Sequence, residues 1–271
     1  MKTSVIGFPR VGKLRELKFA TEKYFRNEIT AQQLEETAED IRKYQWNLQK
    51  ESNIDYIPSN DFSFYDLVLD TAVLFNIVPK EYKELNLSDI DTYFAMARGY
   101  QGENGDVKAL AMKKWFNTNY HYIVPEIEDD TEIKLVGTNP FKYYSEAKKD
   151  GIETKPVVVG PFTLLKLARF TGNKSVDDFV DDTIKAYSEL LNELSKLGVN
   201  WIQFDEPFLV HDITKEDLTL FDKIYNAVLA KKENIKVLLQ TYFGDIRDSY
   251  KNIQSSNLML LDLILLKEKK H

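Results

Sequence analysis

Short apolar segments alternate with longer amphipathic ones along most of the chain. Six of the short segments have the length and the β-branched or aromatic content of strands, and they lie at residues 3–8, 54–59, 120–125, 155–160, 200–205 and 235–243. Segments with helical periodicity separate them. This alternation predicts βα units that build a parallel sheet.

Two of the separating segments carry clear helix signals. Thr30 and Gln33 have the spacing of a capping box before an apolar stripe, and a second helix is predicted from Asp177 to Leu197, with Gly198 as its C-terminal cap. The chain lacks the glycine fingerprint of a dinucleotide-binding sheet, so the repeats favour a (β/α)8 TIM-type barrel. Because such a barrel needs eight strands, we expect an incomplete α/β barrel of about six βα units, with the final strands missing or altered.

The end of the chain, residues 251–271, breaks this pattern. Its apolar run has no turn residues and fits neither a clean helix nor a clean strand. Synonymous codons for residues 257–269 can be chosen so that a shift of one nucleotide reads FDAIGLDFIEGK, which is a better barrel strand. We therefore expect residues 1–250 to form the barrel domain and residues 251–271 to be an aberrant, frameshifted tail of a truncated protein.

Composition limits the possible functions. The 271 residues are 43% hydrophobic and 29% charged, as in a folded globular domain, and the net charge of -7 predicts no nucleic-acid or membrane partner. There is no cysteine and there are only three histidines, so no metal site is predicted. The absence of a signal core and of a membrane-length apolar run predicts a cytoplasmic protein.

A basic cluster follows the first apolar segment within nine residues, and it consists of Arg10, Lys13, Arg15 and Lys18. The strand is expected to end near Phe8 and a helix to begin near Lys13, with inward-facing Leu14, Leu17, Ala20 and Tyr24. Arg15 and Lys18 then share a face at the end of the first strand, where barrels bind ligands. A helix N-terminus beside cations favours a carboxylate or a phosphate. The alternative is a solvated basic helix face.

The segment KWFNTNYHYIVPE, residues 114–126, combines aromatic rings with polar side chains. Aromatic faces can stack on a flat heterocycle while an amide reads its edge and a cation meets an anion. Lys114 and Asn117 are therefore candidate binding residues. For Trp115 and Tyr122, packing in the barrel core is the favoured interpretation.

Two carboxylates, Asp205 and Glu206, end the fifth predicted strand in the sequence QFDEP. Because adjacent residues of a strand point to opposite faces, at most one of them enters the barrel. They are candidates for acid/base chemistry or ligand orientation, and a structural hydrogen-bonding pair at the rim is an equal alternative. Asp61 and Asp66, in NDFSFYD, are as well suited to ordering loops as to binding.

Taken together, GFPRVG with RELK, NDFSFYD, KWFNTNYHY, VGPFT and QFDEP resemble, in order from about residue 3 to 250, the N-terminal half of cobalamin-independent methionine synthases. The resemblance implies methyl transfer from 5-methyltetrahydropteroyltriglutamate to homocysteine by two face-to-face barrels, with zinc and the catalytic residues in the C-terminal one. It also implies that the folate polyglutamate is bound here by Arg15, Glu16, Leu17, Lys18 and Lys114.

The chain itself is then expected to be inactive. Homocysteine must attack as a thiolate, which zinc coordination provides, and the zinc-binding motifs of the family are absent from this sequence. The implied partners are folyl-polyglutamate, a separate or absent C-terminal catalytic barrel, and a second copy of the chain paired at an open sheet edge. The alternatives are a self-contained TIM-barrel hydrolase or lyase using Asp205 or Glu206, and a truncated product without function.

Overall fold

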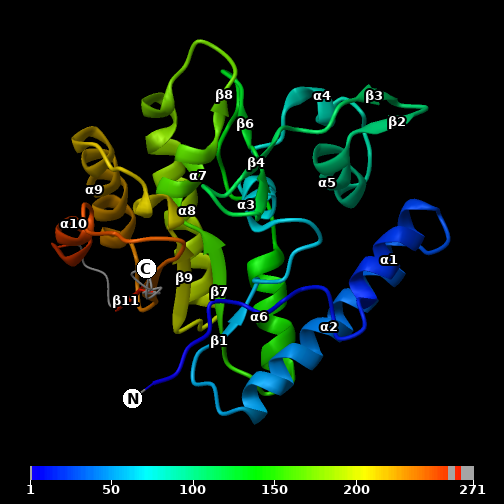
Figure 1. The fold of residues 1–271 in the computed structure, drawn as a ribbon, viewed down its shortest axis with the longest axis horizontal. Helices are drawn as coiled ribbons and strands as arrows, with labels where there is room; N and C mark the ends of the chain where they lie inside the picture. The colour runs from blue at the N-terminus through cyan, green and yellow to red at the C-terminus, as the bar shows by residue number, and fades with distance from the viewer. Residues whose placement is uncertain (1, 256–259, 264–271) are drawn as a thin grey trace, which may run out of the picture.

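A parallel five-stranded sheet forms the centre of the computed structural model, which describes residues 2–255 and 260–263 (Figure 1). Its strands, in spatial order, are β1 (Ile57–Ser59), β7 (Thr154–Val159), β9 (Trp201–Asp205), β10 (Lys236–Thr241) and β11 (Leu260–Leu263). Every neighbouring pair is parallel. The spatial order is also the chain order, without the reversal of a doubly wound sheet, so the strands form an arc of an incomplete barrel.

Helices connect and cover these strands. The α-helices are α1 (Glu16–Phe25), α2 (Ala31–Glu51), α3 (Leu67–Leu74), α4 (Lys80–Lys83), α5 (Asp89–Arg98), α6 (Asn139–Lys149), α7 (Pro161–Leu167), α8 (Val180–Lys196), α9 (Lys215–Ala230) and α10 (Tyr250–Ser255). Two 3₁₀ helices are η1 (Val176–Phe179) and η2 (Pro207–Val210). Helices α2 and α6 pack on β1, whereas α7, α8 and α9 pack on one another.

Three small two-stranded sheets extend from this body. The antiparallel pairs are β2 (Tyr100–Gly102) with β3 (Gly105–Val107) and β4 (Met112–Lys114) with β5 (His121–Ile123); the parallel pair is β6 (Glu126–Ile127) with β8 (Arg169–Phe170).

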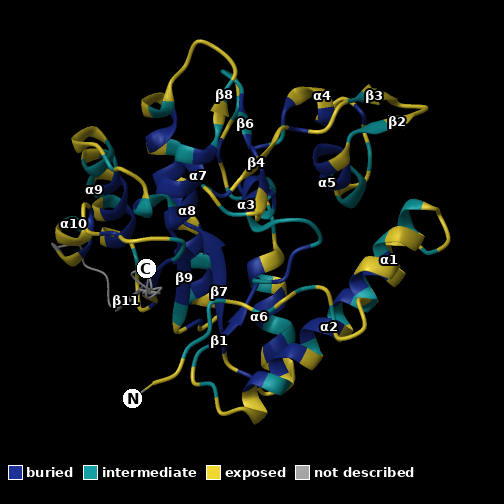
Figure 2. Ribbon diagram, in the orientation of Figure 1, coloured by how far each residue is buried: buried dark blue, intermediate teal, exposed yellow. Residues whose placement is uncertain are grey.

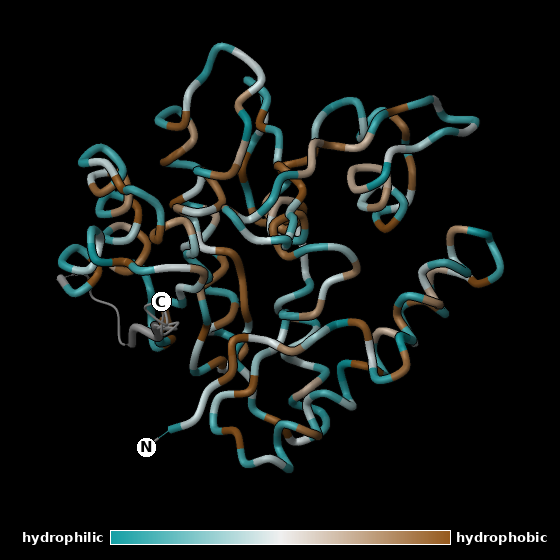
Figure 3. Tube along the Cα trace, viewed as in Figure 1, coloured by the Kyte–Doolittle hydropathy of each residue, from teal (hydrophilic) through white to brown (hydrophobic). Residues whose placement is uncertain are grey.

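Burial on both faces explains the composition of the central strands. All six residues of β7 are buried, and Figure 2 shows the buried class concentrated along β7 and β9. The same strands carry hydrophobic residues in Figure 3, as expected of parallel strands that are covered on both sides. The main apolar core joins these strands to α8 and α9, with Phe204 and Tyr187 in ring contact.

The structure confirms much of the predicted pattern. The segments at 54–59, 155–160, 200–205 and 235–243 contain β1, β7, β9 and β10. The capping box of Thr30 and Gln33 starts α2, and Gly198 follows α8 with a φ of 80°. The fold is therefore an α/β parallel-sheet fold of the incomplete-barrel kind that the alternation predicts.

Two predicted strands were wrong in their pairing. Residues 3–8 make a single parallel bridge, between Ser4 and Tyr56, instead of a ladder. Residues 120–125 contribute only the short β5, which turns back on β4 and does not enter the central sheet. A run of apolar residues indicates that a segment is buried, but it does not indicate which strand the segment pairs with.

The start of the first helix was also predicted too early. The helix α1 begins at Glu16 and not near Lys13, and Leu14 is 73% exposed instead of facing inward. Gly12, with a φ of 81°, belongs to the turn that precedes the helix.

The expected open edge at β10 is covered by the backbone of β11, which pairs in parallel with it from Leu238–Leu260 to Thr241–Leu263. Residues 256–259 and 264–271, which include much of the proposed tail, lie outside the described residues. The division into a domain at 1–250 and an aberrant tail at 251–271 stays a prediction.

One buried ion-pair cluster joins α2 to α6. The Arg42 guanidinium on α2 is almost fully buried and lies 2.9 Å from Glu35 and 2.9 Å from Glu146 on α6. It also stacks over the Tyr143 ring, 4.0 Å from the ring centroid. Removing the buried cation would leave the two carboxylates with the Lys142 ammonium alone, which lies 2.8 Å from Glu35 and 4.0 Å from Glu146.

We therefore expect Arg42→Met to lower the free energy of unfolding by about 3 kcal/mol, measured by urea denaturation. The matched control is Lys43→Met, because the Lys43–Glu39 pair is solvent-exposed and is expected to add little. Equal effects of the two substitutions would contradict a stabilising role for the buried cluster.

Candidate functional site

The basic loop, residues 10–18, lies on the side of the sheet where the parallel strands end. The bridge at Ser4 shows that the N-terminal segment runs parallel to β1. The backbone N–H of Phe8 then donates to the Asp61 carboxylate at 2.7 Å, and Asp61 lies two residues after the end of β1. The carboxyl ends of strands are where barrel folds carry their ligand sites.

Arg15 has an unusual backbone conformation at the start of α1. It occupies the N-cap position with φ 65° and ψ 33°, in the left-handed region, and its side chain makes no capping hydrogen bond. A left-handed non-glycine residue costs roughly 1–2 kcal/mol, and such residues cluster at binding sites. Glu16 stiffens the same turn, because its carboxylate accepts a hydrogen bond from the Leu14 N–H at 2.9 Å.

Leu17 and Lys18 point in different directions. Leu17 is buried against Ala38, Ile41 and Phe62, so it anchors the helix to α2. The Lys18 side chain is 53% exposed, and its only described ion pair joins it to Glu22 at 3.7 Å on the same helix. Among the four predicted residues of this loop, Arg15 and Lys18 are the exposed cations, whereas Glu16 and Leu17 hold the shape.

Lys114 and Asn117 lie on the hairpin of β4 and β5. The Lys114 ammonium is exposed and hydrogen-bonded to the Asn119 side chain at 3.3 Å, and Asn117 is exposed as well. Between the described parts of this hairpin and residues 10–18 there is no hydrogen bond or ion pair. The structure confirms core packing for Trp115 and Tyr122, which are both buried.

Sequence reasoning missed a strained aromatic cluster beside Lys114. Phe116 and Phe243 have positive φ values of 52° and 80°, and their ring centroids lie 5.9 Å apart. Tyr120 is 70% exposed and stacks on Phe243 at 6.2 Å. Positive φ is rare for bulky residues, and nothing in the local sequence indicates it.

Asp205 ends β9 as a buried, fully engaged carboxylate. It accepts hydrogen bonds from the Gln203 amide at 2.7 Å and from the Tyr242 hydroxyl at 3.2 Å. Burial raises the pKa of Asp205 to about 7, although the Lys155 ammonium acts in the opposite direction.

Glu206 is a structural cap. Its carboxylate accepts hydrogen bonds from the backbone N–H groups of Phe162 and Thr163, at 3.1 and 2.7 Å, and from the Tyr225 hydroxyl at 2.7 Å. These N–H groups belong to the first turn of α7, which has no internal partner for them. Burial raises the pKa of Glu206 to about 7.

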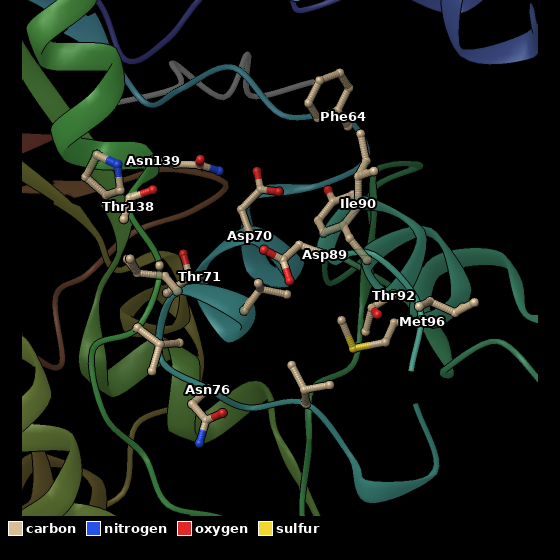
Figure 4. Close-up of a pocket in the computed structure, with 18 of the residues that line it drawn as sticks. Phe64, Asp70, Thr71, Asn76, Asp89, Ile90, Thr92, Met96, Thr138 and Asn139 are labelled. Carbon is tan, nitrogen blue, oxygen red and sulfur yellow. The ribbon is translucent and has the colours of Figure 1, made fainter. Parts of the chain in front are cut away.

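A cavity of about 730 Å³ opens between α3, α5 and the start of α6 (Figure 4). Asp70, Asp89 and Asn139 are among its polar lining residues. Burial raises the pKa of Asp70 to about 7, although hydrogen bonds from Ser63 and Tyr93 oppose this. None of the predicted site residues lines this cavity. Asp70 has a sequence signal that we overlooked, since it is the charged residue of the apolar helix LVLDTAVL.

Within the described part of the chain, no group of three or more His, Cys, Asp or Glu residues is arranged to hold a metal ion. Together with the lack of cysteine, this donor set does not fit zinc. The described helices also include none that is long and apolar enough to cross a membrane.

The sheet topology and the exposed cations at its carboxyl end define an incomplete βα-barrel domain with a candidate anion-binding loop. The model of the family "cobalamin-independent synthase, N-terminal domain" matches residues 2–271, and the chain belongs to this family.

Similar curated proteins are 5-methyltetrahydropteroyltriglutamate–homocysteine methyltransferases. The protein from Streptococcus suis is 57% identical over 255 residues, which are 94% of this chain and 34% of the relative. The protein from Streptococcus thermophilus is 56% identical over 253 residues, which are 93% of this chain and 34% of the relative. The chain thus spans about a third of the length of these relatives.

Solved structures of distant sequence share the fold. A Listeria monocytogenes protein assigned as a vitamin-B12-independent methionine synthase gives a TM-score of 0.65 at 15% identity, covering 96% of this chain and 73% of that one. A B12-independent methionine synthase from Shewanella gives 0.61 at 15% identity, covering 86% and 64%.

The raised pKa of Glu206 predicts a pH-dependent stability. Folding raises this pKa from an ordinary value near 4.3 to about 7, so the folded state binds more protons between these pH values. The contribution of Glu206 to stability is therefore largest below pH 4 and falls by up to about 3 kcal/mol as the pH rises through 7.

Urea denaturation of the wild type and of Glu206→Gln, each at pH 5, 6, 7 and 8, tests this effect. We expect the wild type to lose stability relative to the variant as the pH rises, whatever the offset between them at pH 5. Parallel stability curves would show that the Glu206 carboxyl does not titrate in this range.

Proposed function

We propose that this chain is the substrate-binding N-terminal domain of a cobalamin-independent methionine synthase, which holds the polyglutamate tail of the methyl-donor folate. Arg15, Lys18 and Lys114 bind the tail carboxylates, and Glu16 and Leu17 fix the loop that presents two of these cations. The observation that carries the proposal is the exposed Arg15–Lys18 pair at the strained N-terminus of α1.

The chemistry of this loop suits a chain of carboxylates. A guanidinium forms bidentate hydrogen bonds with a carboxylate, and the N-terminus of a helix favours negative charge. The chain as a whole has a net charge of -7, so a polyanion has to be drawn by a local cluster. The names of the similar proteins give a folate with three glutamates as their substrate.

Catalysis is proposed to take place in a C-terminal barrel that binds zinc and homocysteine, on the same or a separate polypeptide. The reaction of the assembled enzyme is methyl transfer from 5-methyltetrahydropteroyltriglutamate to homocysteine in the cytoplasm. A zinc ion bound there would lower the pKa of the homocysteine thiol and so stabilise its thiolate form. The described residues of this chain contribute binding, and Asn117 is proposed as a further polar contact beside Lys114. A second copy of the chain, paired at an open sheet edge, is proposed as an additional partner.

A self-contained hydrolase or lyase is the second candidate, favoured by the pKa of Asp205 near 7, which suits an acid/base group. The hydrogen bonds from Gln203 and Tyr242 weaken this candidate, because they already engage both oxygens of the carboxylate. Glu206 is less suited still, since it caps α7.

The binding proposal predicts that a substitution at Arg15 weakens ligand binding without lowering the stability of the fold. Arg15→Gly should keep or raise the free energy of unfolding, by up to about 1 kcal/mol, because glycine adopts the left-handed conformation without strain. Arg15→Gly and Lys18→Ala should each weaken pteroyltriglutamate binding about tenfold at low salt, measured by calorimetry.

Lys23→Ala is the control, since Lys23 carries the same charge near the other end of α1. The affinity of Lys23→Ala for pteroyltriglutamate should stay within about twofold of the wild-type value. An equal loss of affinity in all three variants would contradict a specific site and would indicate a general effect of charge.

Because catalysis is assigned to the C-terminal barrel, we also predict that the purified chain, supplied with zinc, forms no methionine from 5-methyltetrahydropteroyltriglutamate and homocysteine. The reason is that the chain has no cysteine ligands for a zinc ion, and such an ion is needed to coordinate the homocysteine thiol as a thiolate. The assay follows methionine by mass spectrometry, with a full-length family member as positive control. Methionine formed by the chain alone would contradict the proposal.

A further inference from the structure

The segment that leads into the basic loop is held by side chains and not by a β-ladder. Its single bridge, between Ser4 and Tyr56, leaves the following backbone groups without strand partners. Residues 5–9 are partly to fully exposed, so these backbone groups can bond to water or to side chains. Four side chains, from β7, β9, α2 and the residues after β1, bond to these groups.

Two of these side chains come from the central sheet. The Lys155 ammonium on β7 donates to the carbonyl oxygen of Val5 at 3.0 Å, and the Gln203 amide on β9 donates to that of Ile6 at 3.1 Å. Lys155 also donates to the side-chain oxygen of Gln203. Both side chains are buried, with residue exposures of 1% and 0%.

The other two act closer to the basic loop. The Asp61 carboxylate accepts the backbone N–H of Phe8 at 2.7 Å, and the Gln45 amide on α2 donates to the carbonyl oxygen of Pro9 at 2.8 Å. Gln45 is buried. Consecutive parts of residues 5–9 are thus fastened to β7, β9, the end of β1, and α2.

The orientation of Gln203 is fixed by its neighbours. Its side-chain oxygen faces the Lys155 ammonium, while its NH₂ group donates to both Ile6 and the Asp205 carboxylate, the latter at 2.7 Å. Reversal of this amide would set donor against donor at Lys155 and acceptor against acceptor at Asp205. Asp205 is thereby connected to the N-terminal segment.

We propose that Gln45, Asp61, Lys155 and Gln203 form a side-chain clamp that sets the position of Arg15 and Lys18 for the polyglutamate tail. Gln45 and Asp61 are positioning residues in this sense, since they act through the backbone at Pro9 and Phe8. This inference rests on the proposed function. A tail with several carboxylates requires several cations in register, whereas a single glutamate requires fewer, so the clamp determines the preference for longer tails.

The test measures the affinities of the full chain for pteroyltriglutamate and for pteroylmonoglutamate, and takes their ratio. Gln45→Met and Asp61→Ala each remove one clamp hydrogen bond and should lower this ratio about fivefold. Asp61→Asn keeps an oxygen that can accept the Phe8 N–H, so it should restore the ratio to within about twofold of the wild type.

Thr183→Val is the control for general destabilisation. Thr183 is buried in α8, where its hydroxyl donates to the Phe179 carbonyl at 2.8 Å, and it belongs neither to the clamp nor to the loop. This variant should lose stability and keep the wild-type ratio. Unfolding midpoints of all variants are measured in parallel, so that affinities are compared among folded chains.

The outcomes separate the inference from the proposed function. If Lys18→Ala lowers the ratio while Gln45→Met and Asp61→Ala leave it unchanged, the clamp inference is overturned and the binding function stands. The clamp inference is also overturned if a clamp variant loses affinity equally for both ligands. It is overturned as well if Thr183→Val lowers the ratio of the two affinities. If Lys18→Ala itself leaves the ratio unchanged, the proposed function fails and the inference fails with it.

Discussion

The buried ammonium group of Lys155 is the interaction on which the arrangement of this domain depends. It is a charged group inside a parallel sheet, where an uncompensated charge costs several kcal/mol. Its compensation comes from hydrogen bonds to Val5 and Gln203 and from its electrostatic interaction with the carboxyl groups of Asp61 and Asp205. Meeting this requirement draws the N-terminal segment across the sheet, so that the basic loop emerges at the carboxyl ends of the strands.

Sequence patterns that indicate burial predict the central strands correctly, whereas the strand pairing of a segment depends on tertiary contacts and does not follow from its own sequence. Continuous apolar runs identified β7, β9 and β10, because strands buried on both faces have no other signature. Residues 3–8 have the same apolar character, yet side chains such as Lys155 take the place of a strand partner. No local rule distinguishes these two cases.

The candidate site divides in the same way. The charges and spacing of Arg15 and Lys18 indicated an anion site, and that information lies in the residue types themselves. The left-handed backbone of Arg15 and the positive φ of Phe243 could not be inferred, since neither residue type favours this conformation. The role of Glu206 as a helix cap depends on N–H groups that lie more than forty residues earlier in the chain.

The central claim is that the basic loop, together with Lys114, receives the polyglutamate tail. Backbone amide NMR of the labelled chain, titrated with pteroyltriglutamate, tests this claim most directly. We predict that the largest shift changes occur at residues 10–18 and at Lys114, with smaller ones around Asp61 and Gln45. Changes centred on the cavity between α3 and α5, near Asp70 and Asp89, would place the ligand elsewhere and contradict the account.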